Sequence, residues 1–420
     1  MLTLRRTRRL TGRLGPGLIT GAADDDPSGL ATYSQAGTQF GSGLLWTLTL
    51  TTPLMVGIQM VSARIGWLTG QGLAANICRA MPRPVALALV GLLVVANVLN
   101  IAADIAAMGQ ALQLAVGGLA LAYAVVFGVV CAVLPVVLNY ESVVRVLKWL
   151  TLALLAYVGV VLTLHVAWLD VLRALVMPSL QWNGAYWQMI VAVLGTTISP
   201  YLFFWQAAQE AELRQHLPDP EAAIGQPHLV ARHLRRIRID TTVGMVFSNA
   251  MALCVMLATA VTLHAHGITE IQTTRDAALA LRPIAGEFAF VLFAFGIVGT
   301  GLLAVPVLAG SAAYAVADVF HWRSGLDRKL TEARGFYAVL ITATALGTLV
   351  GFTAIDPIKA LLWSAMVNGV VAVPIMVVMM RLGSDSTLLG EHTLGRATRR
   401  LGWAATAVMA AAVGAMAFTW

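Results

Sequence analysis

The chain has 420 residues and a net charge of +7, yet only 11% of its residues are charged and 59% are hydrophobic. A soluble domain carries about 25% charged residues, so this composition excludes a water-soluble globular protein and predicts a helical membrane protein. The apolar residues come in long runs rather than in alternating segments of about 10, which excludes a transmembrane β-barrel.

Eleven hydrophobic runs predict eleven transmembrane helices, each long enough to cross about 30 Å of hydrocarbon. The basic segment 1–14 precedes them and lacks the pattern of a cleaved signal. Residues 15–420 are expected to form one transmembrane domain. The expected helices are, in chain order, 15–36, 43–63, 85–113, 117–139, 146–169, 187–208, 239–264, 286–319, 335–354, 359–380 and 401–420.

The basic residues give an independent check on this count. If the N-terminus is cytoplasmic, the cytoplasmic segments contain all of the 27 basic residues except Arg173, Arg275, Arg282 and Lys359. Positive charge favours the cytoplasmic side, and one helix too many or too few would destroy the alternation. We therefore expect a multi-pass protein of the cell (inner) membrane with a cytoplasmic N-terminus and an external C-terminus. The basic stretch 231–240 then is a cytoplasmic loop, which disfavours nucleic acid as a partner.

The first span contains three consecutive carboxylates, since it reads GPGLITGAADDDPSGLATYSQAG. A charge near the middle of the membrane costs about 2.5–3.5 kcal/mol, so Asp24, Asp25 and Asp26 need a cation, protons or water. Pro27 removes a backbone donor and interrupts the helix. The pattern predicts a broken helix and a cation site with Asp26, at the break, as the ligand. Asp24 and Asp25 are expected to be vestibule charges on a proton or permeation pathway.

The sixth span, VAVLGTTISPYLFFWQAAQEAE, is interrupted in a similar way by glycine, hydroxyl residues and Pro200. A simple proline hinge is the alternative for this span alone. Two interrupted spans at corresponding positions of two halves predict a substrate site near the membrane midplane. The halves are 15–169 and 187–380, each with five spans and therefore in inverted orientation, and 401–420 is an additional helix.

Together these spans resemble the Nramp family of divalent-metal transporters, which have a LeuT-type fold. The resemblance follows the span order over nearly the whole chain, and further matching segments are ARIGWLTGQGLAANIC (63–78), NIAADIAAMGQAL (100–112) and LAGSAAYAVADVF (308–320). The resemblance implies an all-α fold in which helices 1 and 6 are broken around the metal.

The chain also departs from the family pattern. The family motif Asp-Pro-Gly-Asn falls on residues 26–29, so that Gly29 replaces the asparagine, and Met-Pro-His falls on residues 199–201, so that Ser199 replaces the methionine. Gln206 stands for a second family histidine. The acidic pair of the third helix is reduced to Asp104, with Ala107 in place of a glutamate. This indicates a divergent member, near the magnesium-transporting branch.

The substituted motif predicts a metal site made only of oxygen ligands. Without the thioether the site favours hard ions, Mg²⁺ or Mn²⁺ above all, and Gly29 is expected to leave room for metal-bound water. The candidate ligands are the carboxylate of Asp26, carbonyls near Ala23 and Thr196, the hydroxyls of Ser28, Thr197 and Ser199, and the amide of Asn368.

Proton coupling is an open alternative at this stage. Histidine is suited to proton transfer near neutral pH, but spans one, three and six have none. Asp26 with Asp104 offers another relay, and Glu210 marks the cytoplasmic end of the pathway.

The function expected from the sequence is secondary transport of a divalent metal cation by alternating access. The alternative is a LeuT-fold symporter of a small organic solute, where the aspartates would favour an amine over an anionic group. No histidine cluster, Ser-His-Asp set or nucleotide loop indicates an enzyme, so no enzymatic activity and no cofactor are expected. We expect a monomer or weak dimer in the lipid bilayer.

Overall fold

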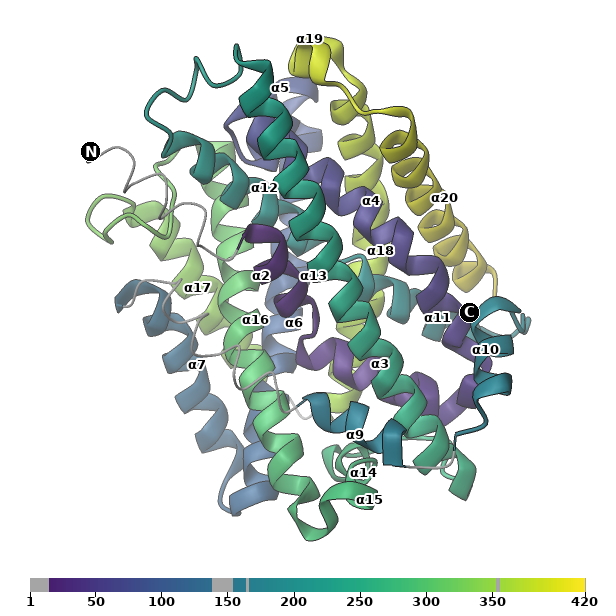
Figure 1. Ribbon diagram of the computed structural model, residues 1–420. Helices are drawn as coiled ribbons and strands as arrows, with labels where there is room; N and C mark the ends of the chain where they lie inside the picture. The colour runs from purple at the N-terminus through teal and green to yellow at the C-terminus, as the bar shows by residue number, and fades with distance from the viewer. Residues whose placement is uncertain (1–14, 138–153, 164–165, 353–355, 420) are drawn as a thin grey trace, which may run out of the picture.

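The computed structural model describes residues 15–137, 154–163, 166–352 and 356–419. Within these residues the chain forms helices joined by turns and short connections, and no strand is present (Figure 1). The basic segment 1–14 and the first part of the expected span 146–169 lie outside the described residues.

Helices occupy the expected spans. Eight helical segments of the described residues are long and apolar enough to cross a membrane, which agrees with a multi-pass membrane protein. Within the expected span 146–169, the described helices are α9 (Leu155–Thr163) and the start of α10 (Trp168–Val176), most of which lies beyond the span. The continuous helices are α4 (Leu45–Thr69), α6 (Arg83–Val116), α7 (Ala120–Val137), α13 (Pro227–Thr262), α16 (Ala289–Phe320), α17 (Arg334–Val350), α18 (Pro357–Ser384) and α20 (Arg396–Thr419).

Both expected helix breaks are confirmed. The first span divides into α2 (Pro16–Asp24) and α3 (Pro27–Phe40), and the sixth into α11 (Gly184–Thr197) and α12 (Pro200–Gln215). In each case proline takes the first helical position of the second half. Its missing N–H is not needed there and its fixed φ suits a helix start, so proline both ends one half and begins the next.

Glycines let the half-helices approach their neighbours closely. A Cβ atom on Gly21 of α2 would lie 2.4 Å from the carbonyl oxygen of Gly244 in α13. On the other side, a Cβ atom on Gly195 of α11 would lie 2.0 Å from the carbonyl oxygen of Ala365 in α18. Neither position accommodates a side chain unless the helices separate.

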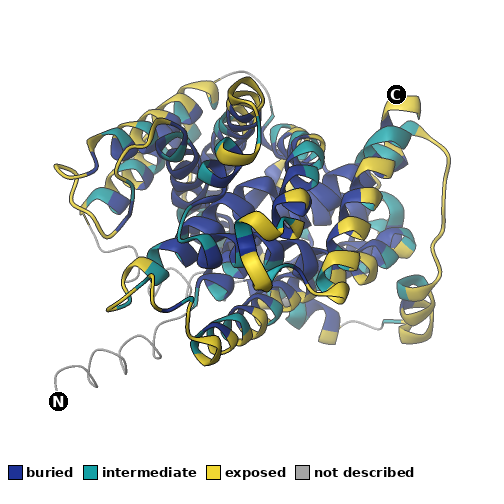
Figure 2. Cartoon of the chain, turned by 90° about the horizontal axis from the view of Figure 1, so that it is seen from above, coloured by how far each residue is buried: buried dark blue, intermediate teal, exposed yellow. Residues whose placement is uncertain are grey.

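The broken helices lie in the middle of the bundle. The α11–α12 span is 89% buried, whereas α7 is 22% and α20 33% buried. Viewed from above, buried segments occupy the centre and exposed faces look outward (Figure 2). The exposed side chains of the outer helices include many large apolar residues, as expected for a surface that faces lipid.

The connecting helices separate into two ends of the bundle. In Figure 1, α5 (Leu73–Ala80) and α19 (Ser386–Leu389) lie at the upper end, and α14 (Thr274–Leu279) and α15 (Arg282–Ala285) at the lower end. This is the separation that the alternation of basic segments requires.

Candidate metal-binding site

Asp26 lies at the first break and is 2% exposed. As the N-cap of α3, its Oδ1 accepts hydrogen bonds from the backbone N–H of Gly29 at 2.7 Å and from the hydroxyl of Ser28 at 2.8 Å. A capping aspartate satisfies N–H groups that a helix start leaves free. The break and its carboxylate are therefore fixed by the same local bonds.

The other oxygen of Asp26 faces two neighbouring helices. Its Oδ2 accepts from the side-chain amide of Asn100 in α6 at 3.0 Å and from the hydroxyl of Tyr201 in α12 at 3.3 Å. The Tyr201 hydroxyl also lies 3.1 Å from the carbonyl oxygen of Ala23, the last turn of α2. Tyr201 thus brings the two breaks together around Asp26.

The hydroxyl groups of the second break point back into their own helix. Ser199 Oγ donates to the carbonyl oxygens of Gly195 and Thr196, at 2.7 and 2.8 Å, and Thr197 Oγ1 lies 2.9 Å from the Val193 oxygen. The two bonds of Ser199 satisfy carbonyls that the end of α11 leaves free. Among the described serine and threonine hydroxyls of this break, that of Thr196 also reaches the first span, since it lies 3.1 Å from the hydroxyl of Tyr33 in α3.

Asp24 and Asp25 are buried rather than open to a vestibule, at 1% and 7% exposed. Both contact the hydroxyl of Ser248 in α13, at 2.6 Å from Asp24 Oδ2 and 2.9 Å from Asp25 Oδ1. The sequence expectation of water-facing charges thus differs from this arrangement, because α2 packs directly on α13. The two carboxylates point to α13, away from the donors of Asp26.

Two further candidates are buried without a hydrogen-bond partner among the described residues. Both oxygens of Asp104 and both polar atoms of Asn368 are in this state. Asp104 lies one helical turn after Asn100 on α6, close enough for its charge to act on that of Asp26. Asn368 lies on α18 next to Gly369, which packs against α11.

The side-chain position at Gly29 is bordered by two groups. A Cβ atom at Gly29 would lie 3.3 Å from the ring of Tyr33 and 3.4 Å from the carbonyl oxygen of Asp24. The water expected beside Gly29 stays a prediction.

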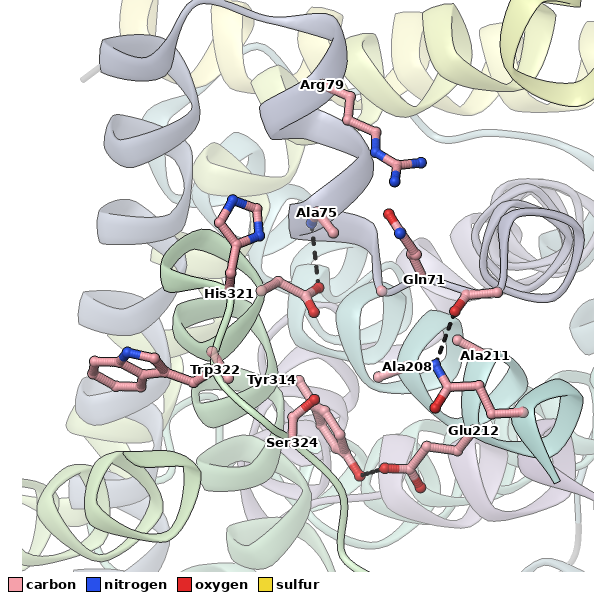
Figure 3. Close-up of a pocket in the computed structure, with 15 residues that line it drawn as sticks. Gln71, Ala75, Arg79, Ala208, Ala211, Glu212, Tyr314, His321, Trp322 and Ser324 are labelled. Carbon is pink, nitrogen blue, oxygen red and sulfur yellow. Dashed lines mark hydrogen bonds between the residues drawn. The ribbon is translucent and has the colours of Figure 1, made fainter. Parts of the chain in front are cut away.

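At the upper end of α12, two glutamates have different surroundings. Glu210, a sequence candidate for the pathway, is buried in an ion pair with Arg236 of α13. Glu212 instead lines a cavity of about 310 Å³ between α5, α12 and α16, where the Tyr314 hydroxyl donates to it at 2.7 Å (Figure 3). The other carboxylate there, Asp318, accepts from the Ala75 N–H. Both carboxylates therefore have a hydrogen-bond partner within the protein.

The charges near the first break are not balanced by basic side chains. None of Asp24, Asp25, Asp26 and Asp104 forms an ion pair among the described residues. The same residues contain no group of three histidine, cysteine, aspartate or glutamate side chains arranged to hold a metal. A cation at Asp26 would therefore be held by one carboxylate together with neutral oxygen atoms.

Sequence reasoning missed three residues of this site as partners of the aspartates: Asn100, Tyr201 and Ser248. Asn100 lies one turn before Asp104, which was a usable signal. Tyr201 follows Pro200 at the position of the family histidine. Ser248 is one of several small polar residues in α13, and the sequence does not single it out.

Comparisons with known proteins agree with this geometry. Residues 17–419 match the family described as Natural resistance-associated macrophage protein-like (Nramp). A similar protein is the divalent metal cation transporter MntH of Klebsiella pneumoniae, which is 27% identical over 94% of this chain and 91% of the relative. MntH of Pectobacterium carotovorum is 26% identical over 95% of this chain and 92% of the relative.

Solved structures share the fold. A manganese transporter of Eremococcus coleocola superposes with a TM-score of 0.78 at 15% identity, covering 97% of this chain and 86% of that one. The transporter MhsT, solved with L-phenylalanine, superposes with a TM-score of 0.66 at 13% identity, covering 96% and 98%. The fold is thus the LeuT type expected from the broken helices. With a family match that spans nearly its whole length, the chain belongs to the Nramp-like family.

Proposed function

We propose that this chain is a secondary transporter that moves a divalent metal cation across the membrane by alternating access. The observation that carries the proposal is the Asp26 carboxylate, which is buried where two broken helices meet and has no basic partner among the described residues. A charge in that place needs a compensating cation. Membership of the Nramp-like family, and relatives of matching length named as divalent metal transporters, support a metal as that cation.

The donor set favours a hard ion. The proposed ligands are Asp26, the carbonyls near Ala23 and Thr196, the hydroxyl of Ser28 and the amide of Asn368. The hydroxyls of Thr197 and Ser199, also expected from the sequence, bond within α11 here and are proposed to contribute less. Every donor atom in this set is oxygen, and no thioether or imidazole contacts Asp26 in the described residues. Oxygen ligands suit Mg²⁺ and Mn²⁺, while soft ions prefer sulfur. We therefore favour Mg²⁺ or Mn²⁺ as substrate.

The remaining acidic residues are proposed to serve the pathway. Asp104 on α6 is one candidate proton acceptor. Asp24 and Asp25, which contact Ser248 of α13, are a second. Glu210 is proposed to act at the cytoplasmic end, where its pair with Arg236 joins α12 to α13.

We also propose a cytoplasmic N-terminus in the cell membrane and an external C-terminus. The support is the separation of the basic connections from α14 and α15. Single cysteines at Ser324 and Thr273, in a background without the three native cysteines, test it by labelling in intact cells. We expect an impermeant maleimide to label only the variant at Thr273, and the reverse result would invert the orientation.

Uptake by the purified protein in proteoliposomes tests the function. Mg²⁺, Mn²⁺ and Ca²⁺ are supplied singly, with a lumenal dye that reports pH. We expect divalent uptake in the wild type and a loss of more than about 100-fold in Asp26→Asn, since even indirect metal partners contribute 10–100-fold. Asp170→Asn is the matched control, because Asp170 is 71% exposed on α10.

Three results would reject the proposal: no uptake of any divalent ion, equal uptake by Asp26→Asn, or equal loss in Asp170→Asn. Exchange of a small amine or amino acid in the same liposomes would then support the organic-solute alternative. A fall of lumenal pH that depends on metal influx would show that protons accompany the metal.

A further inference from the structure

Hydrogen-bond donors lie against both oxygens of the Asp26 carboxylate. An ionised carboxylate has about four lone-pair sites on two oxygens. Oδ1 accepts from Gly29 and Ser28, and Oδ2 accepts from Asn100. The single proton of the Tyr201 hydroxyl is shared between Oδ2 at 3.3 Å and the Ala23 carbonyl oxygen at 3.1 Å. A cation cannot share a lone pair with an N–H or O–H donor, so a metal on the side of Oδ2 that faces α6 and α12 must displace these donors.

The donors to the two oxygens differ in origin. Gly29 and Ser28 belong to the helix that Asp26 caps, and they stay with it when α3 moves. Asn100 and Tyr201 belong to α6 and α12, and their distances of 3.0 and 3.3 Å are the longer ones. The donors to Oδ2 are therefore the ones that a metal would displace.

The amide of Asn100 serves Asp26 and no other group among the described residues. Its Nδ2 donates to Asp26, while its Oδ1 is buried and has no hydrogen-bond partner. Asn97, one turn earlier on the same helix, behaves differently, because its amide donates to the carbonyl oxygen of Leu308 in α16 at 2.9 Å. Asn97 joins two helices, whereas Asn100 lies against the charge.

We propose that Asn100 and Tyr201 take the place of the cation on Asp26 while the metal-free carrier returns across the membrane. This rests on the proposed function, since only a transporter must pass through that step. A buried carboxylate that loses its cation otherwise needs a proton or water. In the proposed step two neutral donors face the carboxylate oxygen that the metal has left.

Several other titratable groups lie near Asp26. They are Asp24 and Asp25 at the same break, Asp104 on α6, Tyr33 on α3 and Tyr201 on α12. These groups are free to add their own pH dependence to transport. Net uptake and exchange of each variant are therefore compared with those of the wild type at the same pH.

The experiment separates exchange from net uptake. Exchange of metal between two loaded sides uses only metal-bound carriers, whereas net uptake also needs the metal-free return. Asn100→Leu keeps the branched shape of the side chain and removes the donor. We expect its net uptake to fall by about tenfold or more, as a hydrogen bond to a charged group contributes, and its exchange to fall by less than about threefold.

Two further variants keep the result interpretable. Tyr201→Phe is expected to lower net uptake more than exchange in the same way, and it serves if Asn100→Leu fails to fold. Asn97→Leu is the matched control, for which we expect exchange and net uptake to fall by equal factors because its bond joins two helices.

Asn100→Asp adds a signature that a purely structural role does not produce. Its side chain is isosteric but donates a hydrogen bond only when protonated. We expect the pH profile of net uptake in this variant to differ from that of the wild type by a gain toward acid pH, while its profile of exchange matches the wild type.

Equal losses of exchange and net uptake in Asn100→Leu and Tyr201→Phe, or no loss in either, would overturn the inference. The same holds if Asn100→Asp follows the pH profile of the wild type. Absence of both exchange and uptake in the wild type would instead reject the transport function itself, so the two failures are distinguishable.

Discussion

The break at Asp25–Asp26 and the break at Ile198–Ser199 both begin a new helix at a proline, yet their polar side chains bond in different directions. At the first break the carboxylate of Asp26 accepts hydrogen bonds from α6 and α12. At the second break the hydroxyl of Ser199 donates to carbonyls of α11. The two breaks therefore share a backbone form and differ in chemistry.

The difference shows what an inverted repeat does and does not determine. It places two interrupted helices at matching depth, since unwound backbone at that depth is tolerated only inside the protein. It does not make the two interruptions equivalent. The charge comes from the first break alone, and the second contributes neutral oxygen atoms and Tyr201.

The largest expected effect is a difference in transport between a variant at the first break and a variant at the second. Asp26→Asn removes the charge and keeps the shape, so that transport falls by more than about 100-fold. Ser199→Ala removes a hydroxyl whose hydrogen bonds stay within α11, and we expect transport to fall by less than about threefold. Uptake of Mn²⁺ by each variant, relative to the wild type, measures the two losses. Equal losses would contradict the assignment of the charge to the first break alone.

The second prediction concerns the glycine contacts of the first break. In Gly21→Val, the added Cβ atom would lie 2.4 Å from the backbone carbonyl of Gly244. Overpacking of this kind lowers the free energy of unfolding by about 1–3 kcal/mol. We expect a lower apparent melting temperature in detergent, because α2 must separate from α13. Gly414→Val on α20 is the control, since no atom lies within 4 Å of its Cβ position. Equal melting temperatures would indicate that α2 is not held by this contact.

The third prediction tests the pair of aspartates beside the site. Ser248→Ala removes the hydroxyl that both Asp24 and Asp25 contact. A hydrogen bond to a charged group contributes about 1.5–3 kcal/mol, so we expect transport to fall about tenfold. Thr262→Val on the same helix removes a hydroxyl that bonds only to the carbonyl of Ala258 and serves as the control. A larger loss in the control would locate the effect in the helix rather than in the aspartates.

The sequence was sufficient to predict the two breaks and a buried carboxylate at the first of them. Proline and glycine within apolar spans, together with carboxylates at membrane depth, have few structural explanations. Asp26 was distinguished from Asp24 and Asp25 by its place before Pro27. The structure separates the three in the same way, since only Asp26 contacts α6 and α12.

The partners of these groups could not be predicted with the same certainty, because they depend on packing between distant segments. Asn100 lies 74 residues from Asp26 in the sequence. A buried asparagine in a membrane span usually forms a hydrogen bond to a neighbouring helix. The partners of Glu210 and Glu212 could not be predicted for the same reason. Two residues apart, they face different sides of α12, and only the packing of α13 and α16 decides that Glu210 meets Arg236 while Glu212 lines the cavity.

The smallest expected effect tests whether the two breaks communicate through a side chain. Thr196 and Thr197 both bond to the carbonyl of Val193, but only Thr196 also reaches the Tyr33 hydroxyl of α3, at 3.1 Å. Thr196→Val should therefore lower transport by a few-fold, since a neutral hydrogen bond contributes about 0.5–1.5 kcal/mol. Thr197→Val should change it by less than about twofold, although the sequence made both residues candidate ligands. Metal uptake at subsaturating concentration resolves this difference. A loss in Thr197→Val that exceeds the loss in Thr196→Val would mean that its hydroxyl turns toward the metal during transport, and the second break would then supply side-chain ligands as well as carbonyl groups.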